Sequence, residues 1–226
     1  MLGTPRRHYR RTDSTNSRLR ELAGRGAPHG TLITAAEQTA GRGRQGRSWT
    51  APPNRALLLS LLIRNPPRLL PLAAGVAVAE ICDQLNHPAQ IKWPNDVLIK
   101  NRKVAGILVE SRPQEGWAIL GIGLNVALAP HDFPPELQNT AATLAQPPGA
   151  IEEVLQRLLK RLTQWTVAPD QAVLESVRTR DALRGRPVSW TGGRGTAAGI
   201  DGEGRLVVNT DAGHVALDSG EVHLGT

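Results

Sequence analysis

Cysteine, aromatic residues and long apolar runs are all scarce in this chain of 226 residues. Cys82 is the only cysteine, which excludes a disulfide framework and a cysteine-ligated zinc site. No apolar run reaches the roughly 18–20 residues of a membrane-spanning helix, and the arginines of Met1–Arg11 are not followed by the apolar segment of a signal peptide. We therefore expect a cytoplasmic protein that is not bound to a membrane.

The positive charge of the chain is confined to its N-terminal part. The net charge is +7, and residues 1–47 contain 10 arginines and 3 acidic residues, whereas basic and acidic residues balance from residue 48 onward. A field localised in this way favours an anionic partner at one site, either nucleic acid or a phosphate-bearing small molecule. Aromatic residues make up only 3% of the chain, and Trp49 alone lies beside the arginine-rich loop. A single-stranded nucleic-acid platform would need more stacking rings among the charges.

Hydrophobic periodicity predicts a mixture of helices and strands, followed by a segment of short strands. The side chains of Thr12–Ser14 are suited to cap a helix over residues 17–23, and further helices are expected over 71–85, 151–165 and 172–183. Strands are expected at 31–36, 57–63, 97–99, 104–110 and 117–126, then at 187–190, 196–200, 206–210, 214–217 and 221–224. Loops join them over 37–54 and 130–149, and Arg6–Arg11 is expected to be a solvated tail or the flank of a strand.

The predicted elements change after Gly185 to a series of short strands, and this change suggests two domains. We expect an α/β (α+β) domain of catalytic size over residues 1–182 and a small β domain over residues 183–226. Short strands separated by glycine-containing turns, over about 40 residues, fit an SH3-like β-barrel.

A glycine- and arginine-rich loop, Gly41–Ser48, carries Arg42, Arg44 and Arg47 within six residues. Its glycine spacing is that of a dinucleotide-binding loop and is close to that of a P-loop, but both need a helix to begin directly after the glycines. Trp49–Asn54 contains two consecutive prolines and does not fit that helix, so both interpretations are rejected. Two remain open: a solvated basic loop, or a loop whose guanidinium groups order over an anionic ligand.

Two further segments place polar groups beside apolar ones. Lys92–Asp96 holds a lysine, an amide and a carboxylate, a set suited to phosphate and Mg²⁺, and an ordinary polar turn fits equally well. Lys103 opens the apolar strand Val104–Val109, where an ammonium group can neutralise a ligand carboxylate in an apolar cleft. A solvated lysine at the end of a strand is the simpler interpretation of Lys103 taken by itself.

Five segments together are far more informative than any one of them. They are Ser14–Asn16, Glu37–Arg47, Lys92–Asp96, Arg102–Leu108 and Gly121–Asn125. In this order and spacing they closely resemble the biotin–protein ligase family, over residues 8–126 in the motifs and over 185–226 in the small β domain. The resemblance implies a mixed-sheet catalytic domain of the biotin/lipoate ligase type. Only about 10 residues precede the motifs, so we expect a short form without the N-terminal DNA-binding domain of some family members.

The resemblance implies an ATP-dependent reaction in two steps. Biotin and MgATP give biotinyl-5′-AMP and pyrophosphate, and biotin then passes to a lysine of a biotin carboxyl carrier protein, such as the carrier domain of acetyl-CoA carboxylase. Biotin is therefore the expected substrate, with ATP and Mg²⁺ as cofactors. Positioning and charge neutralisation carry this chemistry, in agreement with the lack of a serine or cysteine nucleophile signature. A homodimer is compatible with the resemblance, whereas specific DNA binding is not expected.

The resemblance also implies site residues. Lys103, Arg44 and Arg42 are the implied catalytic residues. The implied biotin site comprises Ser14, Thr15, Asn16, Gln38, Arg42, Gly43, Arg44, Lys103, Gly106 and Leu108. The implied ATP site comprises Arg44, Arg47, Trp49, Lys92, Asn95 and Asn125, and Asp96 is the implied magnesium ligand. Two alternatives stay open: a lipoate–protein ligase-like adenylating enzyme, and a non-enzymatic nucleic-acid-binding module.

Overall fold

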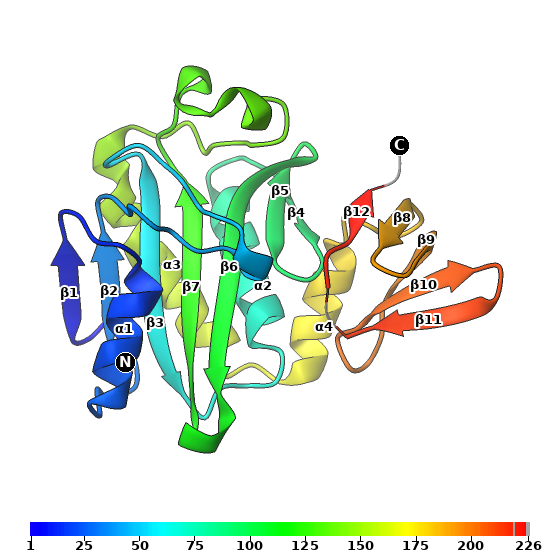
Figure 1. Cartoon of the computed structure of the whole chain (residues 1–226), viewed down its shortest axis with the longest axis horizontal. Helices are drawn as coiled ribbons and strands as arrows, with labels where there is room; N and C mark the ends of the chain where they lie inside the picture. The colour runs from blue at the N-terminus through cyan, green and yellow to red at the C-terminus, as the bar shows by residue number, and fades with distance from the viewer. Residues whose placement is uncertain (219, 225–226) are drawn as a thin grey trace.

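The computed structural model describes residues 1–218 and 220–224, which form two sheets with helices on both faces of the larger one (Figure 1). The larger sheet has the strand order β1-β2-β3-β7-β6-β5-β4, in which β1 runs parallel to β2 and the other neighbours are antiparallel. Its strands are β1 (Arg6–Tyr9), β2 (Leu32–Ala35), β3 (Ala56–Arg64), β4 (Ala89–Lys92), β5 (Asp96–Ile99), β6 (Arg102–Arg112) and β7 (Trp117–Asn125). The predicted α/β class with a mixed sheet is therefore confirmed.

Helices cover the larger sheet unequally. α1 (Thr15–Gly24) packs on one face against β2, β3 and β7, and α2 (Leu70–Gln84), α3 (Ile151–Trp165) and α4 (Asp170–Thr179) lie on the other side. β3 is buried on both faces, since Leu59 and Leu61 join the core under α2 and α3 while Leu62 joins the core under α1. Double burial explains why β3 is apolar on both faces from Ala56 to Ile63, with Ser60 as the single exception. No helix in the described part of the chain is long and apolar enough to cross a membrane.

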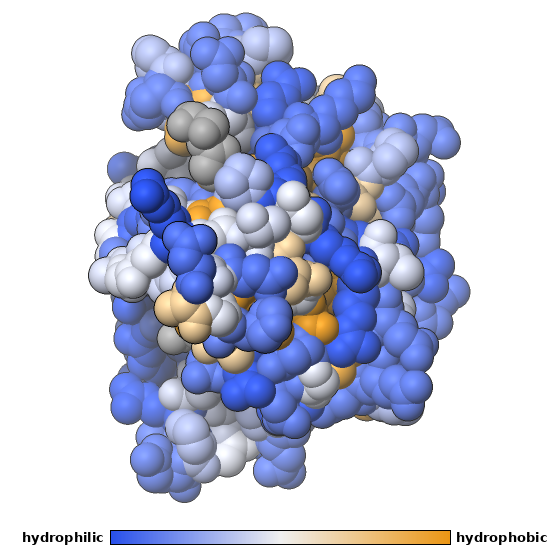
Figure 2. All heavy atoms as spheres, turned by 90° about the vertical axis from the view of Figure 1, so that its right-hand side faces the viewer, coloured by the Kyte–Doolittle hydropathy of each residue, from blue (hydrophilic) through white to orange (hydrophobic). Residues whose placement is uncertain are grey.

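The C-terminal segment forms a separate antiparallel sheet with the strand order β11-β10-β9-β8-β12. Its strands are β8 (Pro187–Trp190), β9 (Gly193–Ile200), β10 (Leu206–Thr210), β11 (Gly213–Leu217) and β12 (His223–Leu224). The second antiparallel sheet agrees with the short strands predicted for this segment. Within residues 187–218 and 220–224 no pairing joins β11 to β12, so the sheet stays open and does not form the predicted closed SH3-like barrel. The side of the molecule formed by this sheet is mainly hydrophilic, with a few separate hydrophobic patches (Figure 2).

Two predicted segment boundaries were wrong. α4 ends at Thr179 rather than at residue 183, because the following residues pair with β4: the Ile91 N–H donates to Arg180 O and the Ala182 N–H to Ile91 O, at 2.8 and 3.0 Å. Residues 6–9, expected to be a solvated tail or the flank of a strand, themselves form edge strand β1. Three of its four side chains are exposed, so no alternation of polar and apolar residues marks it in the sequence.

Cys82 lies on α2, fully buried in the core between the sheet and the helices. Burial raises the pKa of its thiol to about 12, so the unreactive thiol rather than the thiolate is present near neutral pH. We expect iodoacetamide to leave Cys82 of the native protein unmodified and to alkylate it after unfolding in urea, as measured by intact-protein mass spectrometry. Equal alkylation rates in native and urea-unfolded protein would contradict this prediction.

Candidate active site

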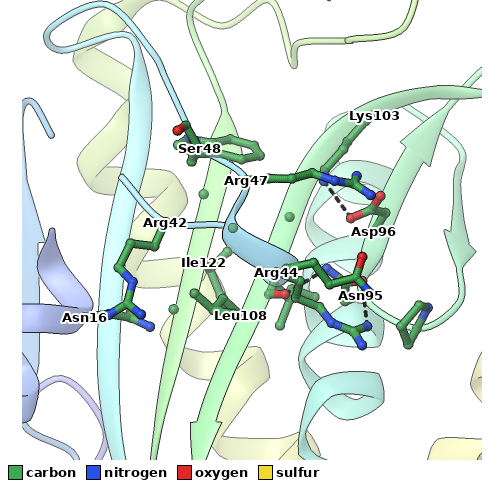
Figure 3. Close-up of a pocket in the computed structure, with 18 of the residues that line it drawn as sticks. Asn16, Arg42, Arg44, Arg47, Ser48, Asn95, Asp96, Lys103, Leu108 and Ile122 are labelled. Atoms are coloured by element: carbon green, nitrogen blue, oxygen red, sulfur yellow. Dashed lines mark hydrogen bonds and ion pairs between the residues drawn. The ribbon is translucent and has the colours of Figure 1, made fainter. Parts of the chain in front are cut away.

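One pocket opens on the face of the larger sheet that carries α1, over β6 and β7 (Figure 3). It holds about 880 Å³ of empty space, part of it open to solvent. The first turn of α1, the loop from Gln38 to Trp49, the turn from Lys92 to Asp96 and Gly220–Val222 of the C-terminal segment form its walls. Segments from the two ends of the chain therefore meet at this pocket.

The structure places nearly all of the predicted site residues in the lining of this pocket. The lining includes Ser14, Thr15, Asn16, Gln38, Arg42, Gly43, Arg44, Arg47, Trp49, Lys92, Asn95, Asp96, Lys103, Gly106 and Leu108. Asn125 is the exception: its side chain is buried away from the pocket, and its Nδ2 donates to Ala142 O at 2.9 Å. In this structure Asn125 fixes the loop after β7 rather than facing a ligand.

A chain of polar side chains forms the end of the pocket at α1. Ser14 occupies the N-cap position of α1 but makes no capping hydrogen bond with its side chain, so its hydroxyl is left for other partners. The backbone N–H and hydroxyl of Thr15 donate to Gln38 Oε1 at 2.7 and 3.0 Å. The Ser60 hydroxyl lies 2.7 Å from Thr15 Oγ1 and donates to Asn16 Oδ1 at 2.5 Å. Ser60 interrupts the apolar run of β3, and the sequence analysis missed this signal of a buried polar group behind the pocket lining.

Glycines of β6 and β7 make the floor of the pocket flat. A Cβ on Gly123 would lie 2.4 Å from Trp49 Cε2, and a Cβ on Gly106 would lie 3.0 Å from Trp49 Cζ3. The indole of Trp49 therefore rests in a slot that only glycine leaves open. Its Nε1 is buried without a hydrogen-bond partner among the described residues, which leaves one donor for a ligand.

The opposite end of the pocket concentrates positive charge around one carboxylate. Lys103 Nζ lies 2.7 Å from Asp96 Oδ1, and Arg44 donates to Asn95 Oδ1 at 3.1 Å (Figure 3). The pKa of Lys92 lies below its ordinary value, mainly because its ammonium group is partly buried and further because Lys103 and Arg47 are close. Burial also lowers the pKa of Arg44. Cations that destabilise one another in this way bind an anion favourably.

A β-bulge directs Lys103 into this charged end. Val97 pairs with Ala105 whereas Leu98 pairs with Lys103, so Val104 is the extra residue of β6. Val104 and Ala105 both join the core under α2, and the ammonium group of Lys103 lies close to Gly106 on the pocket face. Regular alternation would put Lys103 on the core side, since it is three residues from Gly106. The bulge reverses that direction.

Comparisons with known proteins agree with this architecture. The family profile described as "Biotin/lipoate A/B protein ligase family" matches residues 8–126, and the profile described as "Biotin protein ligase C terminal domain" matches residues 184–225. The chain belongs to the biotin/lipoate A/B protein ligase family. Among the relatives of this family member, the bifunctional ligase/repressor BirA of Bacillus subtilis is 36% identical over 94% of this chain and 71% of its own length. The biotin–[acetyl-CoA-carboxylase] ligase of Mycobacterium tuberculosis is 35% identical over 93% of this chain and 85% of its own.

A solved structure extends this agreement to the whole fold. The biotin protein ligase from Aquifex aeolicus in complex with biotin and ATP is similar with a TM-score of 0.85 and 29% identity, covering 98% of this chain and 99% of that chain. The similarity covers both sheets of the present chain. The fold expected from the motifs is thus confirmed.

The C-terminal segment of this family member contributes directly to the pocket. Arg47 of the loop forms an ion pair with Glu221, which lines the pocket with Gly220 and Val222. Trp93 is almost fully buried, and its indole N–H donates to Gly204 O at 2.9 Å, joining the turn before Asp96 to the second sheet. Neither Glu221 nor Gly204 lies in a recognisable motif, so the sequence analysis had no signal for them.

Proposed function

We propose that this protein is an ATP-dependent biotin–protein ligase. The observation that carries the proposal is the pocket described above. It joins an end at α1, lined mainly by uncharged polar side chains, to a cationic end at Lys92–Lys103 across a flat glycine floor. A ligand that is polar but uncharged at one end and anionic at the other fits such a pocket. Biotin, with its ureido ring and its carboxylate, has this character, and relatives with biotin ligase activity in their names support it.

The first reaction joins two anions, so neutralisation of charge is its main requirement. A carboxylate oxygen of biotin attacks the α-phosphorus of ATP, the bond from that phosphorus to the bridging oxygen breaks, and pyrophosphate leaves. We infer that Lys103, Arg44 and Arg42 bring the two anions together and stabilise the charge that develops. In the second reaction the amine of a carrier-protein lysine attacks the activated carbonyl, and AMP leaves.

In this proposal the two ends of the pocket bind different ligands: biotin lies at the α1 end and the phosphates of ATP lie at the cationic end. At the α1 end Ser14, Thr15, Asn16 and Gln38 hydrogen-bond the ureido ring, and Gly43, Gly106 and Leu108 contact the rest of biotin. At the cationic end Arg44, Arg47, Lys92 and Asn95 hold the phosphates, with Trp49 beside the adenine. We assign no phosphate contact to Asn125, because its amide is already bonded to the loop after β7.

Magnesium fits this end of the pocket as an ion carried by the nucleotide. Asp96 supplies one carboxylate, and the described residues hold no group of three or more His, Cys, Asp or Glu side chains that would cage a metal. Mg²⁺ is commonly held by one or two carboxylates together with substrate phosphates. When bound, it would neutralise phosphate charge, and Asp96 would then exchange its contact with Lys103 for the metal.

The acceptor is a biotin carrier protein, and we propose that it is the carrier domain of acetyl-CoA carboxylase. We further propose that residues 1–182 form the catalytic domain and that residues 183–226 form an accessory domain, which completes the pocket through Gly220–Val222. A homodimer and a cytoplasmic location remain predictions of the sequence analysis. The lipoate alternative is not favoured, because the named relatives and structures above are biotin ligases.

Exchange of labelled pyrophosphate into ATP tests the proposed function without an acceptor protein. We expect exchange that depends on biotin, and none when lipoate or octanoate replaces it. Exchange with lipoate alone would indicate a lipoate–protein ligase-like adenylating enzyme instead. No exchange with any of the three acids would overturn the proposed adenylation.

A further inference from the structure

Glu110 on β6 is a charged residue directly behind the pocket lining, and none of the assigned roles uses it. It follows Gly106 and Leu108 on the same face of the strand and is largely buried, with 21% of its side chain exposed. Three groups converge on its carboxylate. Oε2 accepts from Asn16 Nδ2 at 2.7 Å, and Oε1 lies 2.5 Å from Arg20 and 3.3 Å from Arg42.

The contact with Asn16 determines which way round its amide lies. An ionised carboxylate only accepts hydrogen bonds, so Nδ2 of Asn16 must face Glu110. Oδ1 then faces Ser60, which donates to it at 2.5 Å. Gly121 makes this arrangement possible, because a Cβ at that position would lie 2.3 Å from Asn16 Oδ1. The amide is therefore held on both sides, and its remaining hydrogen and lone pair face the pocket in a fixed pattern.

We propose that Glu110 is a positioning residue that fixes the orientation of the Asn16 amide for the ureido group and anchors Arg42 of the glycine-rich loop. The inference rests on the proposed function, since it takes biotin as the ligand at the α1 end. Because one carboxylate holds both groups, it joins the wall of the pocket to the loop that closes over it. Glu110 itself touches no reacting atom.

Replacement of Glu110 by glutamine has a specific consequence. The guanidinium groups of Arg20 and Arg42 attract the oxygen of the introduced amide, which leaves its NH₂ group facing Asn16. The Asn16 amide then rotates so that its oxygen accepts from the introduced glutamine, and Ser60 accepts from Nδ2 instead of donating to Oδ1. Every polar group keeps a partner, so the fold is retained while the pattern offered to the ligand is reversed.

Steady-state pyrophosphate exchange measures this reversal. We expect Glu110→Gln to raise the KM for biotin about 10-fold or more, because the reversed amide faces the ureido group with donor and acceptor exchanged and leaves polar groups unpaired in the complex. The KM for ATP and the melting temperature should be unchanged. Glu152→Gln is the matched control, since Glu152 is also paired with an arginine, Arg6, but contacts no residue of the pocket lining. An unchanged KM for biotin in Glu110→Gln would overturn the inference.

A double variant tests the contact between Asn16 and Glu110 itself. In Asn16→Asp/Glu110→Gln the contact is remade with donor and acceptor exchanged, so we expect this double variant to melt at a higher temperature than Asn16→Asp. Its KM for biotin should stay high, because the Nδ2 donor has been lost. A double variant that melts no higher than Asn16→Asp would overturn the inference, also where Glu110→Gln alone fails to fold.

The proposed function and this inference fail in different ways. A wild-type protein without biotin-dependent exchange would overturn the function itself. Normal exchange in wild type, Glu152→Gln and Glu110→Gln alike would overturn only the role of Glu110.

Discussion

Replacement of Lys103 by alanine is expected to lower biotin-dependent pyrophosphate exchange by about 100- to 1,000-fold, the usual loss when one group that stabilises developing charge is removed. Lys103 Nζ lies 2.7 Å from Asp96 and 5.7 Å from the centre of the Trp49 ring, between the two ligand regions. The bulge at Val104 directs this lysine onto the pocket face of β6. The loss should fall on the rate of adenylate formation.

The fold should tolerate this change, because about a third of the Lys103 side chain is exposed and its backbone pairing stays intact. Lys103 N–H donates to Thr140 O and Lys103 O accepts from Ala142 N–H, both at 2.7 Å, whatever the side chain is. Lys160→Ala on the exposed side of α3 is the control and should exchange normally. An equally active Lys103→Ala variant with an unchanged melting temperature would reduce Lys103 to a solvated lysine at the end of a strand.

The sequence predicted the contents of the site better than its geometry. Its motifs identified the loop with Arg42 and Arg44, the turn with Asp96, and Lys103, and the structure brings these groups into one pocket. The direction of Lys103 was not predictable, because it depends on a bulge that leaves no mark in the pattern of β6. Local pattern describes one strand at a time, whereas a bulge is a property of a pair of strands.

The residues that the sequence analysis missed are those whose meaning depends on distant partners. Glu110 is 94 residues from Asn16 along the chain. In the sequence it has the pattern of an ordinary polar residue at the end of an apolar strand. Glu221 acquires its place at the pocket only because the C-terminal segment returns to Arg47. β1 and β4 were missed for a related reason, since strands of only four residues are specified by the strands with which they pair rather than by their own composition.

The second large effect is expected when the slot under Trp49 is filled. Gly123→Val places a branched side chain where even a Cβ would lie 2.4 Å from the indole, so Trp49 must leave the floor of the pocket. Gly123 has no left-handed backbone conformation to lose, and valine suits a strand, so β7 should keep its pairing with β3 and β6. We therefore expect the side chain of Trp49, which belongs to a loop, to be displaced rather than the sheet to be disrupted.

The displaced indole can no longer lie beside the adenine, and stacking of an aromatic side chain on a base contributes about 1–3 kcal/mol. We therefore expect the KM for ATP to rise about 10- to 100-fold, with a smaller change in the KM for biotin. Gly149→Ala is the matched control, because a Cβ there meets nothing within 4 Å. If Gly123→Val instead lowered the melting temperature and left the KM for ATP unchanged, the slot would serve packing alone. The glycines of β6 and β7 would then have no part in nucleotide binding.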